Sequence, residues 1–243
     1  MRFARSAIHA LGELVWPTAC LLCGGPMPAE PSSVSLCPAC KIALGTDPFS
    51  TCTRCASSIG PHVPSAESCG RCEKEKYHFA SAQRLGVYDG LLREAVLKIK
   101  NPQQEVLAET LGLFWGEHSR ARLLQSMPQC LIPVPLHWGR RWTRGFNQSE
   151  SLARGLSLAL KLPIATWAVR RIRPTPSQTT QTPSERRKNV MGAFQRTRFS
   201  NLRDMRVLLI DDVLTTGATS DAVTTALLAS GVAQVDVAVL AHR

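Results

Sequence analysis

The stretch that decides the fold is Val207-Leu208-Leu209-Ile210-Asp211-Asp212-Val213-Leu214-Thr215-Thr216-Gly217-Ala218-Thr219. Its apolar first part predicts a buried strand over Met205–Ile210, which stops before Asp211. The loop Thr215–Thr219 consists of small and hydroxylated residues, and residues 220–230 predict a helix after it. Successive backbone N–H groups in such a loop, together with a helix N-terminus, form a concave binding site for an anion.

The adjacent carboxylates of Asp211 and Asp212 narrow the choice of ligand. Two carboxylates repel an anion beside them unless a sugar diol or Mg²⁺ bridges the two charges. The pair therefore predicts a sugar phosphate or a metal-bound phosphate as ligand, and the alternative is a capped turn with solvated aspartates. The loop lacks the Lys-Ser/Thr pair of a Walker loop, which excludes an ATPase of that class.

Strands and helices alternate on both sides of this stretch. Strands are expected over residues 80–88, 130–136, 164–169, 205–210 and 234–240, and helices over 91–100, 103–124, 147–161 and 220–230. Asn147 and Glu150 have the spacing of a capping box at the start of the third helix. This order predicts an α/β fold with a mainly parallel sheet, helices on both faces, and a ligand at the carboxyl ends of the strands.

A cysteine-rich segment precedes these elements. Eight of the nine cysteines form four Cys-x-x-Cys pairs: Cys20/Cys23, Cys37/Cys40, Cys52/Cys55 and Cys69/Cys72. Thirteen residues separate the first pair from the second and the third from the fourth, which predicts two structural zinc sites with four thiolates each. Disulfides and redox motifs are the competing interpretations. Sequential pairing, with a hairpin in each gap, is favoured over crossed pairing, and Cys130 is expected to be a buried apolar side chain.

All of the net charge of +11 lies in residues 138–198, which hold thirteen Lys or Arg and two Glu. Such a segment attracts polyanions such as pyrophosphate, nucleotides or nucleic acid, although a solvated basic face needs no partner. Interleaved aromatic residues could stack on bases, but the same spacing is common in cores; they are Trp138, Trp142, Phe146 and Trp167. Cations expected near a pyrophosphate are Arg140, Arg141 and Arg144, with Lys98 and Lys100 as further candidates.

No apolar run is long enough to span a bilayer, and residues 1–16 predict a short amphipathic helix rather than a signal peptide. We therefore expect a cytoplasmic protein that does not contact a membrane.

The stretch Val207–Thr219 resembles the ribose-phosphate loop of type I phosphoribosyltransferases. The wider pattern resembles the ComF family over nearly the whole chain. The motifs that carry this resemblance are the four cysteine pairs, Ile132-Pro133-Val134-Pro135-Leu136, Arg144-Gly145-Phe146-Asn147-Gln148, Gln178, Glu185-Arg186-Arg187-Lys188-Asn189 and Gly192-Ala193-Phe194. One departure is Gln178-Thr179-Thr180-Gln181, where family members commonly continue Gln-Thr-Gly-Leu.

The resemblance implies an N-terminal helix and double zinc ribbon over residues 1–76 and a phosphoribosyltransferase-like domain over 77–243. It implies that Asp211 and Asp212 hold the ribose hydroxyls of phosphoribosyl pyrophosphate, which binds with Mg²⁺. The residues implied to take the 5-phosphate are Thr215, Thr216, Gly217, Ala218 and Thr219. It also implies a link to DNA uptake in natural competence.

Three functional hypotheses follow. The chain is a Mg²⁺-dependent phosphoribosyltransferase acting on an unidentified base or amine, or a non-catalytic protein that binds a nucleotide or single-stranded DNA through residues 138–198. Alternatively, the zinc module recruits a helicase or another uptake protein. The sequence leaves the acceptor and the oligomeric state open.

Overall fold

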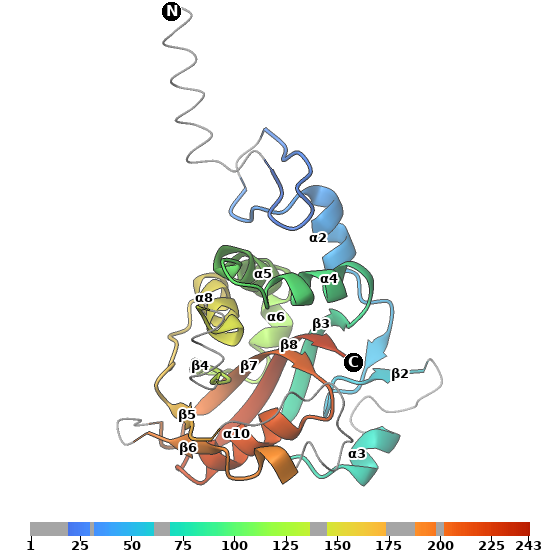
Figure 1. The fold of residues 1–243 in the computed structure, drawn as a ribbon. Coiled ribbons are helices and arrows are strands. Elements are labelled where there is room, and N and C mark those ends of the chain that lie inside the picture. The colour runs from blue at the N-terminus through green and yellow to red at the C-terminus, as the bar shows by residue number, and fades with distance from the viewer. Residues whose placement is uncertain (1–18, 30–31, 61–68, 137–144, 174–187, 198–201) are drawn as a thin grey trace, which may run out of the picture.

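The computed structural model describes residues 19–29, 32–60, 69–136, 145–173, 188–197 and 202–243. The helix expected over residues 1–16 lies outside the described residues. A four-stranded sheet forms the centre of the molecule, in the order β3 (Ser81–Val87), β8 (Gln234–His242), β7 (Arg206–Leu214) and β4 (Cys130–Pro133). All three strand pairs are parallel, which confirms the expected parallel α/β fold (Figure 1).

Helices cover both faces of this sheet. One face packs against α4 (Gly90–Lys98), α5 (Glu105–His118), α6 (Arg120–Leu123) and α8 (Gln148–Leu160), and the other against α10 (Ala218–Leu228) (Figure 1). Strand β7 is buried on both sides. Leu208 and Ile210 belong to the hydrophobic core on the side of α4, α5 and α8, and Val207 and Leu209 belong to the core on the side of α10. Helices α5 and α8 pack very closely, since a Cβ on Gly112 would clash with the Leu152 carbonyl oxygen.

Three expected boundaries were wrong. Strand β7 continues to Leu214, four residues past the expected end, because β8 runs beside it in register and pairs with it up to His242. The helix expected over residues 103–124 breaks at Ser119, whose backbone leaves the helical conformation. Residues 164–168 form no strand, because Ile164 makes only a single bridge to Leu131 before the chain turns.

The chain after that turn forms a separate two-stranded antiparallel sheet. It pairs β5 (Val169–Arg171) with β6 (Phe194–Arg196) and packs against α10. Residues 174–187, which connect these two strands, lie outside the described residues.

The cysteine-rich segment packs beside edge strand β3. Its elements are α2 (Pro38–Gly45), β1 (Ser50–Thr51), β2 (Ser58–Ile59) and α3 (Gly70–Lys74). Helix α2 lies beside α4 and α5, whereas α3 lies at the opposite end of the molecule, near α10 (Figure 1).

A buried arginine on β3 fastens this segment to the sheet. Arg84 is only 2% exposed; it donates from Nε to Asp47 (2.8 Å), from Nη1 to the Ala56 carbonyl oxygen (3.0 Å) and from Nη2 to Ser58 Oγ (2.8 Å). The Asp47 carboxylate balances its charge, so this buried cation is fully paired. No helix of the described residues is both long and apolar enough to cross a membrane.

Candidate functional site

The eight paired cysteines gather into two clusters. Cys20, Cys23, Cys37 and Cys40 form one, and Cys52, Cys55, Cys69 and Cys72 form the other, with all Sγ atoms of a cluster within 4.8 Å of one another. The pairing is therefore sequential, as expected, and all nine thiols are free of disulfides.

The Sγ separations fit a tetrahedral zinc site. Four sulfurs about 2.3 Å from a zinc ion lie about 3.8 Å from each other. The distance is 3.7 Å between Cys23 and Cys37, 3.8 Å between Cys52 and Cys72, and 3.6 Å between Cys55 and Cys69. Two four-cysteine clusters of this size are compatible with two structural zinc ions, and four thiolates leave no open position for catalysis.

The two clusters repeat one local design. In the first, Cys20 N donates to the Gly25 carbonyl oxygen and Gly24 N to the Cys20 carbonyl oxygen; in the second, Cys52 N and Ala56 N make the equivalent bonds. Gly24 and Ala56 occupy the same place in each turn, and both have positive φ, at 75° and 59°.

The second cysteine pair of each cluster lies at a helix start. Cys37 is the N-cap of α2 and Cys69 the N-cap of α3. Backbone N–H groups at a helix start favour the thiolate form that zinc requires. The strands β1 and β2 flank the turn Cys52–Cys55. The hairpin expected in each gap falls partly outside the described residues, because these leave out 30–31 and 61–68.

The expected anion loop joins the end of β7 to the start of α10. Gly217 is the N-cap of α10 with φ +75°, a left-handed conformation that favours glycine, and it offers no side chain to cap the first N–H groups of the helix. Thr216 is 7% exposed, and its Oγ1 accepts from Ala218 N at 3.4 Å. The loop therefore presents backbone donors at the positive end of an 11-residue helix.

The two aspartates lie at the end of β7 with different partners. Asp211 accepts from Ser149 Oγ in the first turn of α8 (3.0 Å) and from the backbone N–H of Asp212 (2.9 Å). Burial and the neighbouring Asp212 carboxylate raise the pKa of Asp211 to about 7. Asp212 pairs with Lys100 Nζ at 3.2 Å, with the two side chains 20% and 31% exposed.

The site therefore holds a carboxyl that titrates near neutral pH next to an ion-paired carboxylate. Such a pair can accept hydrogen bonds from a sugar diol, and its oxygen atoms suit Mg²⁺ brought in by a substrate phosphate. Titratable groups perturbed in this way are common at functional sites.

Asn147 and Ser149 fix the α8 side of this site. Asn147 is the N-cap of α8, as expected: its Oδ1 accepts from Ser149 N (3.3 Å), and its Nδ2 donates to the Val134 carbonyl oxygen just after β4 (3.1 Å). Glu150 pairs with Arg154 one turn later. Ser149 is a site residue that sequence reasoning missed, and its position two residues after the capping Asn147 is the signal that points to it.

The expected cations divide into two groups. Lys98 does not reach the aspartates, because its Nζ donates to the Leu22 carbonyl oxygen in the first cysteine cluster. Lys100, the other lysine candidate, makes the ion pair with Asp212 instead. Arg140, Arg141 and Arg144 lie outside the described residues.

The aromatic residues of the basic segment also differ in environment. Phe146 is 5% exposed in the core, whereas Trp167 is 48% exposed, and Trp138 and Trp142 lie outside the described residues. Cys130 is buried as expected, at 2% exposed, and burial raises the pKa of its thiol to about 11.

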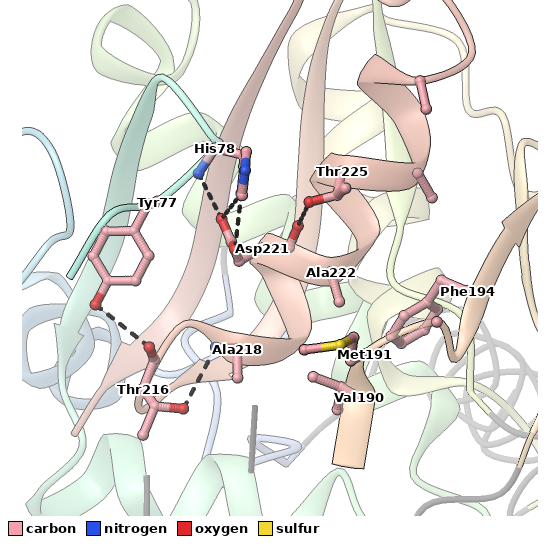
Figure 2. Close-up of a pocket in the computed structure, with 13 residues that line it drawn as sticks. Tyr77, His78, Val190, Met191, Phe194, Thr216, Ala218, Asp221, Ala222 and Thr225 are labelled. Carbon is pink, nitrogen blue, oxygen red and sulfur yellow. Dashed lines mark hydrogen bonds and ion pairs between the residues drawn. The ribbon is translucent and has the colours of Figure 1, made fainter. Parts of the chain in front are cut away.

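Tyr77 and His78 contact the loop Thr215–Thr219 and the first turn of α10, a contact that no local motif indicates. The Tyr77 hydroxyl donates to the Thr216 carbonyl oxygen (3.4 Å), and Asp221 accepts from His78 N (2.5 Å) (Figure 2). Beside them a largely apolar cavity of about 420 Å³ opens between α10 and residues 190–194.

Comparisons with known proteins agree with this geometry. Residues 144–243 match the family described as phosphoribosyl transferase domain. The chain is 31% identical to competence protein F of Haemophilus influenzae, over 83% of this chain and 88% of that protein. It is 30% identical to DNA utilization protein YhgH of Escherichia coli K12, over 92% of this chain and 96% of that protein.

Among solved structures, a hypoxanthine phosphoribosyltransferase of Staphylococcus aureus aligns with 56% of this chain and 65% of its own, at a TM-score of 0.37 and 17% identity. The extensive match to competence protein F, together with the phosphoribosyl transferase domain, shows that the chain belongs to the ComF family.

Proposed function

We propose that this protein binds phosphoribosyl pyrophosphate at the carboxyl end of β7 and serves DNA uptake in natural competence. One arrangement carries the first part: two aspartates lie at the end of a buried strand, and an anion-binding loop follows at the N-terminus of α10. The names of the two relatives, a competence protein and a DNA utilization protein, support the second part.

The residues divide the ligand between them. Backbone N–H groups of Thr215–Thr219 take the 5-phosphate, and the carboxylates of Asp211 and Asp212 accept from the ribose hydroxyls. Lys100 is the nearest described cation to the aspartates; once the sugar occupies Asp212, its ammonium group can turn to the pyrophosphate. Mg²⁺ bound to the pyrophosphate would neutralise further charge on the leaving group.

Transfer would break the bond between C1 and the pyrophosphate oxygen, which leaves with the electron pair. The acceptor then bonds to C1 and loses a proton, through an oxocarbenium-like transition state. Fixed cations and backbone dipoles directed at the leaving group supply the main stabilisation. Asp211, with its pKa of about 7, is the described group best suited to take up that proton at neutral pH.

Calorimetry tests the binding step directly. Phosphoribosyl pyrophosphate with Mg²⁺ should bind the native protein, and Asp212→Asn should weaken binding at least tenfold. Asp204→Asn is the matched control, since that side chain is 88% exposed and lies before β7. A native protein that shows no heat and no thermal shift with this ligand refutes the proposal.

Turnover is a separate measurement. Pyrophosphate release from phosphoribosyl pyrophosphate, followed with a panel of bases and amines, should occur with the native protein and be abolished in Asp212→Asn. Binding without release would leave a nucleotide-sensing protein in place of a transferase.

Structural zinc is the second component of the proposal. We expect about two zinc ions per chain from eight thiolates, each pair of Cys-x-x-Cys motifs holding one. Because such sites need reduced thiols, we also propose a cytoplasmic location. Elemental analysis of the purified protein measures the zinc content, and a value near zero refutes this part.

Single-stranded DNA is an alternative ligand that one observation favours. The two-stranded sheet of β5 and β6 exposes Arg170 and Arg196, and Trp167 beside it is 48% exposed. Exposed arginines and an aromatic side chain suit the phosphates and bases of a single strand.

Fluorescence anisotropy with an oligo-dT probe tests this alternative. Affinity should fall linearly on a log–log plot against salt, and Arg170→Ala with Arg196→Ala should reduce the slope by about 0.7 per lost phosphate contact. Arg203→Ala, whose side chain is 82% exposed and outside the basic segment, is the control. A flat salt response argues against DNA binding through this face.

A further inference from the structure

We propose that the second cysteine cluster, which contains Cys52 and Cys69, positions the phosphate-binding loop Thr215–Thr219. Zinc at this cluster and the sugar phosphate at the loop then favour each other's binding. The connection runs from the turn Cys52–Cys55 through Arg54 to Tyr77 and from there to Gly217. The loop's ligand rests on the proposed function, whereas the positioning of the loop does not.

The first link joins the cysteine turn to the segment that enters β3. Arg54 lies between two cluster cysteines, and its guanidinium donates to the carbonyl oxygens of Tyr77 (2.6 Å), Ala80 (3.0 Å) and Phe79. It also lies 5.7 Å from the centroid of the Phe79 ring. Ala82 N donates to the Thr53 carbonyl oxygen (3.0 Å), so both central residues of the turn hold this segment.

The second link joins that segment to the loop. The Tyr77 ring lies so close to Gly217 that a Cβ there would be 2.7 Å from Tyr77 Cε1. Burial raises the pKa of Tyr77 to about 12, so at neutral pH its hydroxyl is a donor to the Thr216 carbonyl oxygen. The ring stacks on Phe79 with centroids 4.7 Å apart.

His78 extends the contact into α10. Asp221, in the first turn of the helix, accepts from the His78 backbone N–H at 2.5 Å and lies 3.0 Å from its ring Nδ1 (Figure 2). Tyr77 and His78 thus contact both sides of the helix start: one residue contacts the loop backbone, and the next contacts the first helical turn.

These contacts have an energetic consequence for the loop. Its N–H groups bind an anion well only while the left-handed Gly217 and the start of α10 keep their geometry, because preorganised donors cost no ordering on binding. A turn held by a four-cysteine zinc site loses its folded conformation without the metal. Loss of zinc from this cluster would release Arg54 and then Tyr77. By linkage, if zinc at this cluster raises the affinity of the loop for its ligand, the bound ligand raises the affinity of the cluster for zinc by the same factor.

The first cluster provides an internal comparison. It belongs to the core that contains α4 and α5, on the other face of the sheet from α10. Its metal should therefore not affect the loop.

The experiment uses the full-length, zinc-loaded protein with Arg54→Met and Tyr77→Leu, which keep all eight cysteines. Lys41→Met is the matched control, because Lys41 Nζ makes a comparable bond to Ser32 Oγ in the first half of the module. Three quantities are compared: zinc content, hydrogen exchange of residues 214–222, and affinity for phosphoribosyl pyrophosphate with Mg²⁺.

We expect Arg54→Met to retain two zinc ions, exchange the loop amides at least tenfold faster and bind the ligand at least tenfold more weakly. Lys41→Met should alter neither exchange nor affinity. In the native protein, ligand should slow zinc transfer from one site to a chromogenic chelator, and Arg54→Met should remove this effect.

Unchanged loop exchange in both Arg54→Met and Tyr77→Leu overturns the proposal. The exchange measurement needs no ligand. If the native protein fails to bind phosphoribosyl pyrophosphate, the proposed function falls, while accelerated exchange in Arg54→Met still supports the positioning role.

Discussion

The raised pKa of Asp211 makes a quantitative prediction about stability. Asp211 has an ordinary carboxyl pKa of 3.8 when unfolded and a pKa of about 7 in the folded protein. Between these values the folded state binds a proton that the unfolded state has released. Stability from this group is therefore greatest at low pH and is lost as pH rises towards and through 7.

The magnitude follows from the two pKa values. Between pH 5.5 and pH 8 the Asp211 contribution should fall by about 2 kcal/mol. Asp211→Asn keeps the size of the side chain but cannot ionise, so the variant should lack this loss. The free energy of unfolding of Asp211→Asn minus that of the native protein should therefore be about 2 kcal/mol higher at pH 8 than at pH 5.5.

Urea denaturation at four pH values in this range measures the difference. Zinc release and the titration of other groups affect both proteins alike, so they cancel in the comparison. Asp204→Asn, an exposed substitution, should show no pH-dependent difference. The reasoning is refuted if the native protein and Asp211→Asn keep a constant difference, within about 0.5 kcal/mol, from pH 5.5 to 8.

Three further predictions concern other parts of the molecule. Lys100→Met should weaken calorimetric binding of phosphoribosyl pyrophosphate about tenfold, because the cation that offsets Asp212 is lost, whereas Lys100→Arg should restore most of it. Gly155→Ala should destabilise the protein to urea by about 3 kcal/mol, since a Cβ there clashes with the backbone of α5; Gly60→Ala, in open space, should have little effect. Burial and nearby arginines lower the pKa of His242 to about 4, so the free energy of unfolding should fall as the pH drops below 6.5. In urea denaturation at pH 5, His242→Gln should remove about 2 kcal/mol of that loss.

Much of the fold could be predicted because its signals are local. The apolar run before Asp211 must be buried on both faces, which only a central strand of a covered sheet allows. Asn147 caps its helix through a contact two residues away. The cysteine turns close within six residues, so their spacing alone predicted two clusters.

Boundaries failed where a neighbouring strand decided them. Asp211 and Asp212 are poor strand residues, yet β7 continues through them because β8 supplies hydrogen-bond partners as far as His242. Residues 164–169 have the composition of a strand, but only Ile164 meets the edge of β4.

The candidate site, too, combines features that the local sequence indicated with features that depend on distant contacts. The sequence alone indicated which residues form the candidate site at the end of β7, since the aspartates and the loop Thr215–Thr219 are contiguous. Only the tertiary structure decided that Lys100 rather than Lys98 pairs with Asp212, that Ser149 reaches Asp211, and that Tyr77 supports Gly217. Those contacts join residues 62 to 140 positions apart, and their partners are set by how helices and a cysteine turn pack on the sheet, which no local pattern encodes.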